Sequence, residues 1–282
     1  MFLDVLIGLF LIYFVFCVIC SAIMELVATA FSLRAYTRKQ WVARILGNKD
    51  LADEFYRSPL IWSLGNDGNF ITRYLNRMAK KIFGCEVYGN PSYIPSDIFA
   101  TSLVQFVKDR KIGGEIGKII EVLESKDLSK IEEWYEEAMK RVSGWYKRKT
   151  QLGIFLIALV LAIALNLDTI EIANRIYMSS AFSNVLVNYA KGIVENPNDI
   201  PYDALKLSLG WHRWDPSLGF WENFGLYLDA MVKGLHDPIK VAGIFATALA
   251  TIFGAPFWYD TLGRFVRLRA TGEKPKTRSD RK

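Results

Sequence analysis

Three long apolar runs dominate the pattern of hydrophobic and polar positions along the chain. They cover residues 5–31, 152–167 and 239–259. An uninterrupted apolar stretch of about 18 residues or more predicts a transmembrane helix, and a shorter one can span when interfacial residues flank it. We therefore expect an all-α integral membrane protein that crosses the bilayer about three times.

The first run is interrupted only by Ser21, Glu25 and Thr29, and it predicts a membrane helix within residues 1–33. A cleaved signal peptide is the alternative, because Ala28-Thr29-Ala30 resembles a small-residue cleavage site. No Lys or Arg precedes the run, however, and the run is about twice as long as the apolar part of a signal peptide. These features favour a retained span.

The other two runs predict membrane helices over 149–168 and 239–263. The second run is short, but aromatic and cationic residues that include Trp145 precede it and are typical of a membrane interface. A buried helix of a soluble domain is the alternative for a run of this length. In the third run Pro256 removes one backbone donor and predicts a kink in the last turn, before an aromatic belt that includes Trp258.

The distribution of charge predicts an orientation. Basic clusters follow the first run, precede the second and follow the third. All three clusters face one side if the N-terminus is outside and the C-terminus is inside, and the positive-inside rule assigns that side to the cytoplasm. Residues 166–238 hold five Lys and Arg against nine Asp and Glu, whereas residues 261–282 hold eight against two. Residues 264–282 are accordingly predicted to form a basic cytoplasmic tail.

Two polar regions separate the runs. Residues 34–148 are predicted to form a helical cytoplasmic domain, in which Ser129 and Glu132 form a capping box for a helix that continues into the second span. Residues 169–238 are predicted to be extracytoplasmic and to contain interfacial aromatics, namely Trp211, Trp214 and Trp221. A small folded cap with these aromatics as its core is the alternative.

A polar stripe in the first span is the most informative candidate for function. Tyr13, Cys17, Ser21 and Glu25 follow one another at steps of four and share one helix face. Glu25 lies nine positions before Arg34, about 13 Å along a continuous helix. The stripe would line a water-filled path, or Glu25 would pair with an arginine of a neighbouring helix and fix the packing. The second interpretation is favoured, because intramembrane polar groups commonly join helices.

Small residues at steps of four in the other two spans predict close helix packing. The rows are Ala158, Ala162 and Asn166, and then Ala246, Ala250 and Gly254. Because three spans make a thin bundle, we expect a homo-oligomer to bury the polar stripe. After the third span, Arg264, Arg267 and Arg269 predict contact with anionic lipid or with a partner, unless they act only as a topology signal.

Composition and motifs indicate no chemistry. The three cysteines and two histidines have no disulfide or metal-site spacing, so we expect no metal, no cofactor and no catalytic residue. Phosphate-binding, zinc-protease and serine-hydrolase motifs are missing. The net charge of +6 is explained by membrane topology, so nucleic-acid binding is not expected.

Several stretches resemble a family of uncharacterised prokaryotic multi-pass membrane proteins. They are AMKRVSGWYKR at 138–148, GAPFWYD at 254–260 with LRATG at 268–272, and PSYIP at 91–95. The resemblance extends along most of the chain. It implies a multi-pass protein of a prokaryotic inner membrane, and it brings no activity and no catalytic residues.

Three functions follow from these features. The first is a non-enzymatic homo-oligomeric assembly that forms a pore or a membrane scaffold. The second is a membrane anchor or receptor that docks a soluble cytoplasmic protein, for example in stress or defence. The third, a membrane enzyme or transporter, is the least favoured, because a single intramembrane carboxylate is sparse for either.

Overall fold

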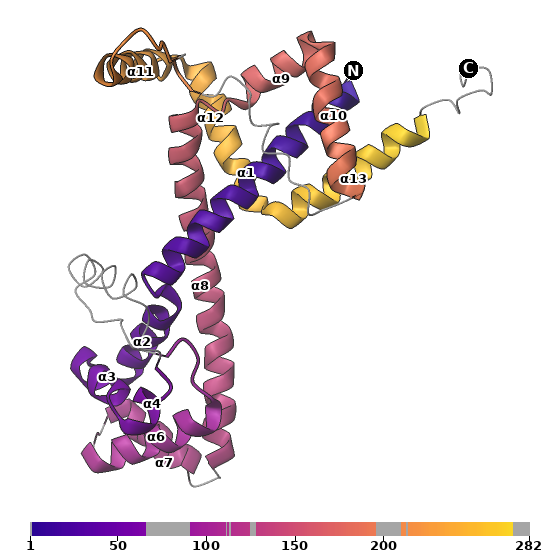
Figure 1. Cartoon of the computed structure of the whole chain (residues 1–282). Helices are drawn as coiled ribbons and strands as arrows, with labels where there is room; N and C mark the ends of the chain where they lie inside the picture. The colour runs from indigo at the N-terminus through magenta and orange to yellow at the C-terminus, as the bar shows by residue number, and fades with distance from the viewer. Residues whose placement is uncertain are drawn as a thin grey trace. The chain divides into compact units, whose positions relative to one another are not determined.

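The chain is helical throughout the part that the structure describes (Figure 1). This computed structural model describes residues 2–65, 91–110, 112, 114–124, 128–195, 210–212 and 214–272. Within those ranges no residue lies in a strand, so the all-α prediction is confirmed for them. The helices are α1 (Phe2–Ala30), α2 (Leu33–Leu46), α3 (Lys49–Tyr56), α4 (Pro59–Trp62), α6 (Ser96–Arg110), α7 (Gly114–Glu124), α8 (Leu128–Leu165), α9 (Thr169–Met178), α10 (Ser180–Glu195), α11 (Phe220–Gly234), α12 (Pro238–Ala250), the 3-10 turn η2 (Thr251–Phe253) and α13 (Ala255–Gly272).

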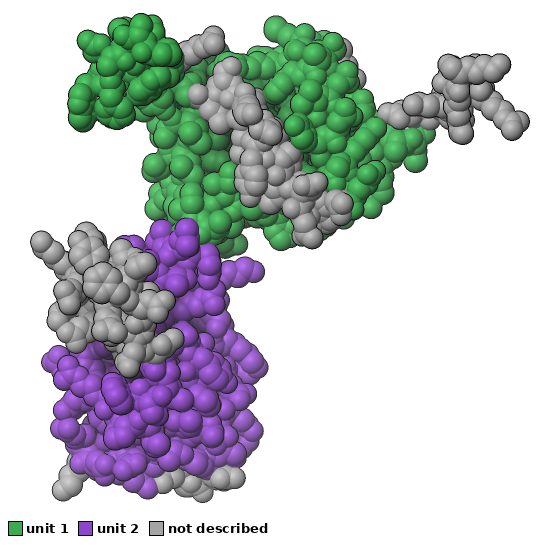
Figure 2. Space-filling model, viewed as in Figure 1, with its two compact units in different colours: residues 1–24, 151–282 green, residues 25–150 purple. Residues whose placement is uncertain are grey.

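The helices form two compact units (Figure 2). Unit 1 comprises residues 1–24 and 151–282, and unit 2 comprises residues 25–150. Each unit has its own buried apolar core. Helices α1 and α8 contribute residues to both units, because the boundaries fall within these helices.

Two helices, α1 and α8, are long and apolar enough to cross a membrane. The third apolar run meets the same test only as a pair of helices, α12–η2 and α13, which are bent by 98° relative to each other. The described residues therefore hold two candidate spans, or three if the bent pair is one span. The prediction of about three membrane helices holds at this coarser level.

The bent pair differs from the single helix predicted over 239–263. α12 ends at Ala250, η2 follows, and Gly254 has φ +81° before α13 begins at Ala255. Glycine adopts positive φ without a steric cost, and proline is tolerated in the first turn of a helix, where its missing N–H needs no partner. The predicted kink at Pro256 is instead a sharp break two residues earlier.

Helix α1 is the most deeply packed candidate span of unit 1. Within its most apolar window 56% of the residues are buried in the protein, against 11% in that of α8. Aromatic contacts join it to α13, since the ring of Phe10 lies 5.4 Å from that of Trp258 and 5.1 Å from that of Phe265. At the start of α1 the Asp4 carboxylate pairs with the Arg269 guanidinium of α13 at 2.7 Å.

This ion pair brings together two segments that the sequence analysis expected to lie apart. The expected orientation separates the N-terminus from residues 264–282 by the width of the membrane, yet Asp4 and Arg269 are in contact. The physical reason is the break at Gly254, which turns α13 back along α1 instead of extending the third run as one straight helix.

Unit 2 is built around aromatic side chains from distant parts of its sequence. The ring of Phe99 on α6 stacks on that of Tyr135 on α8 with centroids 4.0 Å apart, and the rings of Phe55 and Trp41 lie 5.5 and 5.9 Å from that of Phe99. The Tyr135 hydroxyl donates to the carbonyl of Ile94 at 3.1 Å. These contacts pack α2, α3, α6 and the first part of α8 into one helical unit.

Helix α8 begins at Leu128, so the predicted cap Ser129 lies inside its first turn and does not precede the helix. The helix continues through Gly144 into the second apolar run. This continuity agrees with the prediction. Trp145, expected to anchor the helix at an interface, is instead half-buried against the core of unit 2, with the guanidinium of Arg44 5.3 Å from its ring centroid.

Candidate functional site

The predicted polar stripe of α1 does not form one open face. Cys17 is 1% exposed, and Tyr13 is half-buried with its hydroxyl bonded to Thr169. Glu25 is exposed and pairs with Arg34 of α2 at 3.3 Å. The helix ends between the two, and Ser32 adopts φ +48°, so they are not separated by the 13 Å expected along one continuous helix.

The two rows of small residues have different environments. Ala158 and Ala162 of α8 are fully buried in the core of unit 1. Ala250 is 7% exposed, Ala246 is half-buried and Gly254 lies at the break, so the second row does not continue along one helix. The first row is thus used for packing within one chain.

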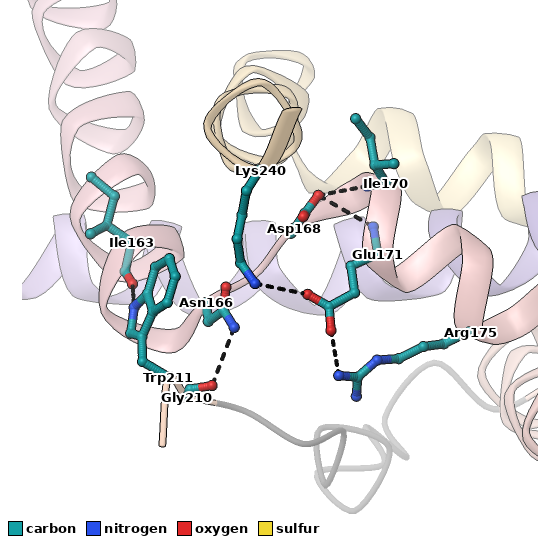
Figure 3. A network of polar contacts seen from close by, with 9 residues as sticks. All are labelled: Ile163, Asn166, Asp168, Ile170, Glu171, Arg175, Gly210, Trp211 and Lys240. Atoms are coloured by element: carbon teal, nitrogen blue, oxygen red, sulfur yellow. Dashed lines mark hydrogen bonds and ion pairs between the residues drawn. The ribbon is translucent and has the colours of Figure 1, made fainter. Parts of the chain in front are cut away.

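The strongest constellation in unit 1 lies at the C-terminal end of α8, where the last carbonyls of a helix have no partner within the helix. Trp211 donates from Nε1 to the Ile163 carbonyl at 2.5 Å (Figure 3). The Gly210 N–H donates to the Leu165 carbonyl at 2.9 Å. The Tyr227 hydroxyl donates to the carbonyl of Ala164. Residues some 45 to 65 positions away in sequence therefore cap the end of a candidate span.

A tight turn links α8 to α9 at this point. Asn166 has φ +53° and donates from Nδ2 to the Gly210 carbonyl at 3.3 Å. Asp168 is 5% exposed and caps α9 by accepting from the N–H of Ile170 at 2.8 Å and of Glu171 at 3.3 Å. Gly243 of α12 faces that carboxylate so closely that a Cβ atom there would collide with it.

Ion pairs lie beside the cap. Glu171 pairs with Lys240 of α12 at 3.2 Å and with Arg175 of its own helix, and the Lys240 ammonium lies 5.1 Å from the centroid of the Trp211 ring (Figure 3). Partial burial raises the pKa of Glu171, but hydrogen bonds and positive charge from Lys240 and Arg175 outweigh it and hold the pKa below its ordinary value.

A chain of hydroxyl groups joins α1, α9 and α12. Tyr13 and Thr169 share a hydrogen bond of 2.9 Å, and Thr169 and Thr247 share one of 2.8 Å. Thr247 is fully buried and donates on to the Leu167 carbonyl at 2.8 Å. In a membrane interior, where water cannot satisfy polar groups, such bonds hold helices together.

The predicted interfacial aromatics divide into two groups. Trp214 and Trp221 are 54% and 78% exposed. Trp258, by contrast, is 8% exposed and donates to the Ala250 carbonyl at 2.7 Å, because the break at Gly254 turns α13 against α1. Trp211 is half-buried and uses its N–H in the cap of α8. Two of the predicted anchors are therefore packing residues of unit 1.

The predicted arginine cluster is also divided. Arg264 and Arg267 are exposed on α13, as lipid or partner contact requires, whereas Arg269 is half-buried against Asp4. Arg269 therefore fixes α13 to α1.

The residues of the cap and its network hold α8, α9 and α12 together through hydrogen bonds and ion pairs. Groups of three or more His, Cys, Asp or Glu able to hold a metal do not occur in the described ranges. Cys17 and Cys20 are buried free thiols, and Cys85 lies outside the described residues.

Several members of the network escaped the sequence analysis. Thr247 carried a usable signal, because it is a hydroxyl residue inside an apolar run. Tyr227, Lys240 and Glu171 carried none, since their partners lie far away along the chain.

Models of known protein families, curated proteins and solved structures give no match to this chain. The resemblance to an uncharacterised prokaryotic membrane family therefore remains a prediction.

Proposed function

We propose that the chain is a non-enzymatic membrane scaffold: an integral protein of a prokaryotic inner membrane that assembles as a homo-oligomer and holds unit 2 at the cytoplasmic face. The observation that carries the proposal is an exposed apolar row on the second half of α8. Leu152, Leu156 and Val160, at steps of four, are 60%, 52% and 65% exposed. Such a row on a helix of spanning length requires lipid or another copy of the chain as its cover.

A scaffold is favoured over a pore because the polar stripe of α1 is occupied by contacts within the chain. Tyr13 and Cys17, the two stripe residues deepest in α1, are packed within unit 1. Glu25 is occupied by Arg34 at the other end of the stripe. A pore would therefore need polar groups other than this stripe.

Assembly is tested by the mass of the full-length protein in native nanodiscs and by disulfide cross-linking of Leu156→Cys, with the exposed Leu268→Cys as the matched control. We expect a defined oligomer and cross-links that form faster at position 156 than at position 268. An exclusively monomeric particle would refute the assembly. Ion flux in liposomes distinguishes a scaffold from a pore. A scaffold leaves the liposomes sealed, whereas a pore makes them leak ions.

The second candidate is an anchor that docks a soluble cytoplasmic partner. It is favoured by a cleft of about 540 Å³ on unit 2, whose lining includes Arg38, Tyr93, Tyr135, Glu136 and Lys140. Tyr93 is 67% exposed, and the Arg38 guanidinium lies 5.7 Å from its ring centroid. Exposed tyrosine and arginine side chains are frequent at protein interfaces.

Affinity capture of the full-length protein from its host membrane tests this candidate. One protein retained by the wild type and lost with Tyr93→Ala would support docking. The exposed Tyr177→Ala of unit 1 is the matched control. Identical recovery from both variants would count against this cleft.

A further inference from the structure

Helix α11 has three distinct faces, and the first attaches it to unit 1. The Tyr227 hydroxyl donates to the carbonyl of Ala164, and Gly234 lies directly against the ring of Trp211. Asn223 is fully buried and fixes the preceding turn, since its side chain accepts from the N–H of Asp215 and donates to the carbonyl of the same residue, both at 2.9 Å. The orientation of the helix is therefore set by defined bonds.

The second face is apolar and exposed. Its members share one side of the helix, because they lie 0, 1, 4, 8 and 12 positions after Phe220. Trp221 is the most exposed of them at 78%, and the rings of Phe220 and Phe224 stack beside it with centroids 6.2 Å apart. The complete set is Phe220, Trp221, Phe224, Leu228 and Val232.

The third face carries the charges of α11, namely Glu222, Asp229 and Lys233, of which the last two pair at 2.6 Å. Both acidic residues and the lysine are exposed. A helix with one apolar side, one charged side and large aromatic rings is typical of a helix that lies in the plane of a membrane interface.

The attachment also fixes the level of α11 along α8. Its bond partner Ala164 is in the last turn of α8, where the apolar run of a candidate span ends. After α11 in sequence, α12 presents a further row of exposed apolar residues at steps of four, namely Val241, Phe245 and Leu249, at 40%, 46% and 39%. Helix α11 is thus bonded to the end of one helix with an exposed apolar row and is followed in sequence by another.

We propose that α11 lies along the boundary between headgroups and acyl chains, on the side of the bilayer where α8 ends, with Trp221 and its apolar neighbours in lipid and Asp229 in water. The proposal rests on the membrane location of unit 1, and it holds for any number of copies. Aromatic rings favour this depth because their apolar bodies enter lipid while an N–H group stays hydrated.

Tryptophan fluorescence of the full-length protein in nanodiscs tests the proposal. The nanodiscs contain phosphatidylcholine brominated near the headgroup end of its acyl chains, and the contribution of Trp221 is the emission removed by Trp221→Phe. The matched control is Trp62→Phe in unit 2, because Trp62 is exposed to a similar degree, 65%. We expect the brominated lipid to quench the Trp221 contribution, and iodide in the buffer to leave it bright.

Two results would overturn the proposal. Quenching of Trp221 by iodide but not by brominated lipid would place the face in water. Protection from both quenchers would place it against protein, such as a second copy. Flotation of the protein with liposomes is measured separately, so failure of membrane insertion is distinguished from failure of this interface.

Discussion

The carboxylate of Asp4 and the guanidinium of Arg269 lie 2.7 Å apart, so the first turn of α1 and the last turns of α13 lie side by side. The contacts continue along both helices in opposite order, since Phe14 meets Tyr259 and Phe10 meets Phe265. Helix α13 therefore runs antiparallel to the first half of α1.

This pairing yields a prediction of topology. If α1 crosses the membrane, Arg269 emerges on the same side as the N-terminus, and α12 with α13 is re-entrant. Alkaline phosphatase fused after Gly272 should then be active outside the cell, while a fluorescent protein inserted after Asn48 in unit 2 should fluoresce inside. A fluorescent protein at position 272 that fluoresces inside, with an N-terminal tag accessible outside, would contradict the re-entrant arrangement and favour a third span.

The contribution of this ion pair to stability can be measured by swapping the two charges. We expect Asp4→Arg to lower the free energy of unfolding by about 1–3 kcal/mol, because the pair is neither fully exposed nor fully buried. Adding Arg269→Asp should restore part of the loss. Thermal unfolding in mild detergent provides the measurement, and strictly additive losses in the double variant would show that the two side chains do not interact.

The cap of α8 predicts a cost for removing one hydroxyl group. Tyr227→Phe leaves the carbonyl of Ala164 without its donor, at an expected cost of about 1–3 kcal/mol. The exposed Tyr177→Phe of α9 should change stability much less. Equal melting temperatures for the two variants would show that the cap contributes nothing.

Close approach of α12 to Asp168 predicts that Gly243 cannot be enlarged. Gly243→Ala places a methyl group against the buried carboxylate and should destabilise unit 1 by about 1–3 kcal/mol. In contrast, Gly192→Ala in α10 meets nothing within 4 Å and should stabilise its helix by up to about 1 kcal/mol. The prediction is wrong if the two substitutions shift the melting temperature in the same direction.

Acid should weaken unit 1 through Glu171. The pKa of Glu171 in the folded protein lies below its ordinary value of 4.5 in the unfolded chain. Its contribution to stability is therefore complete above pH 4.5 and is lost as the pH falls through the lower folded pKa. Glu171→Gln should therefore reduce stability near neutral pH and flatten the decline between neutral and acid pH. Melting temperatures measured across that pH range test the prediction, and the exposed Glu195→Gln is the control. Parallel curves for the wild type and Glu171→Gln would show that Glu171 does not cause the loss of stability in acid.

The sequence by itself determined the helical class and the position of the apolar runs, because both depend on local hydrophobicity and spacing. It also placed α8 correctly as one helix through Gly144. Only the tertiary structure decided that the third run breaks at Gly254, that Arg269 returns to Asp4, and that Trp211 and Tyr227 cap α8. The Asp4–Arg269 pair and the cap of α8 depend on partners tens to hundreds of residues away, and a polar group buried in an apolar environment is stabilised only by the partner that the fold brings to it. The break depends on the positive φ of Gly254, which the apolar pattern of the run does not reveal.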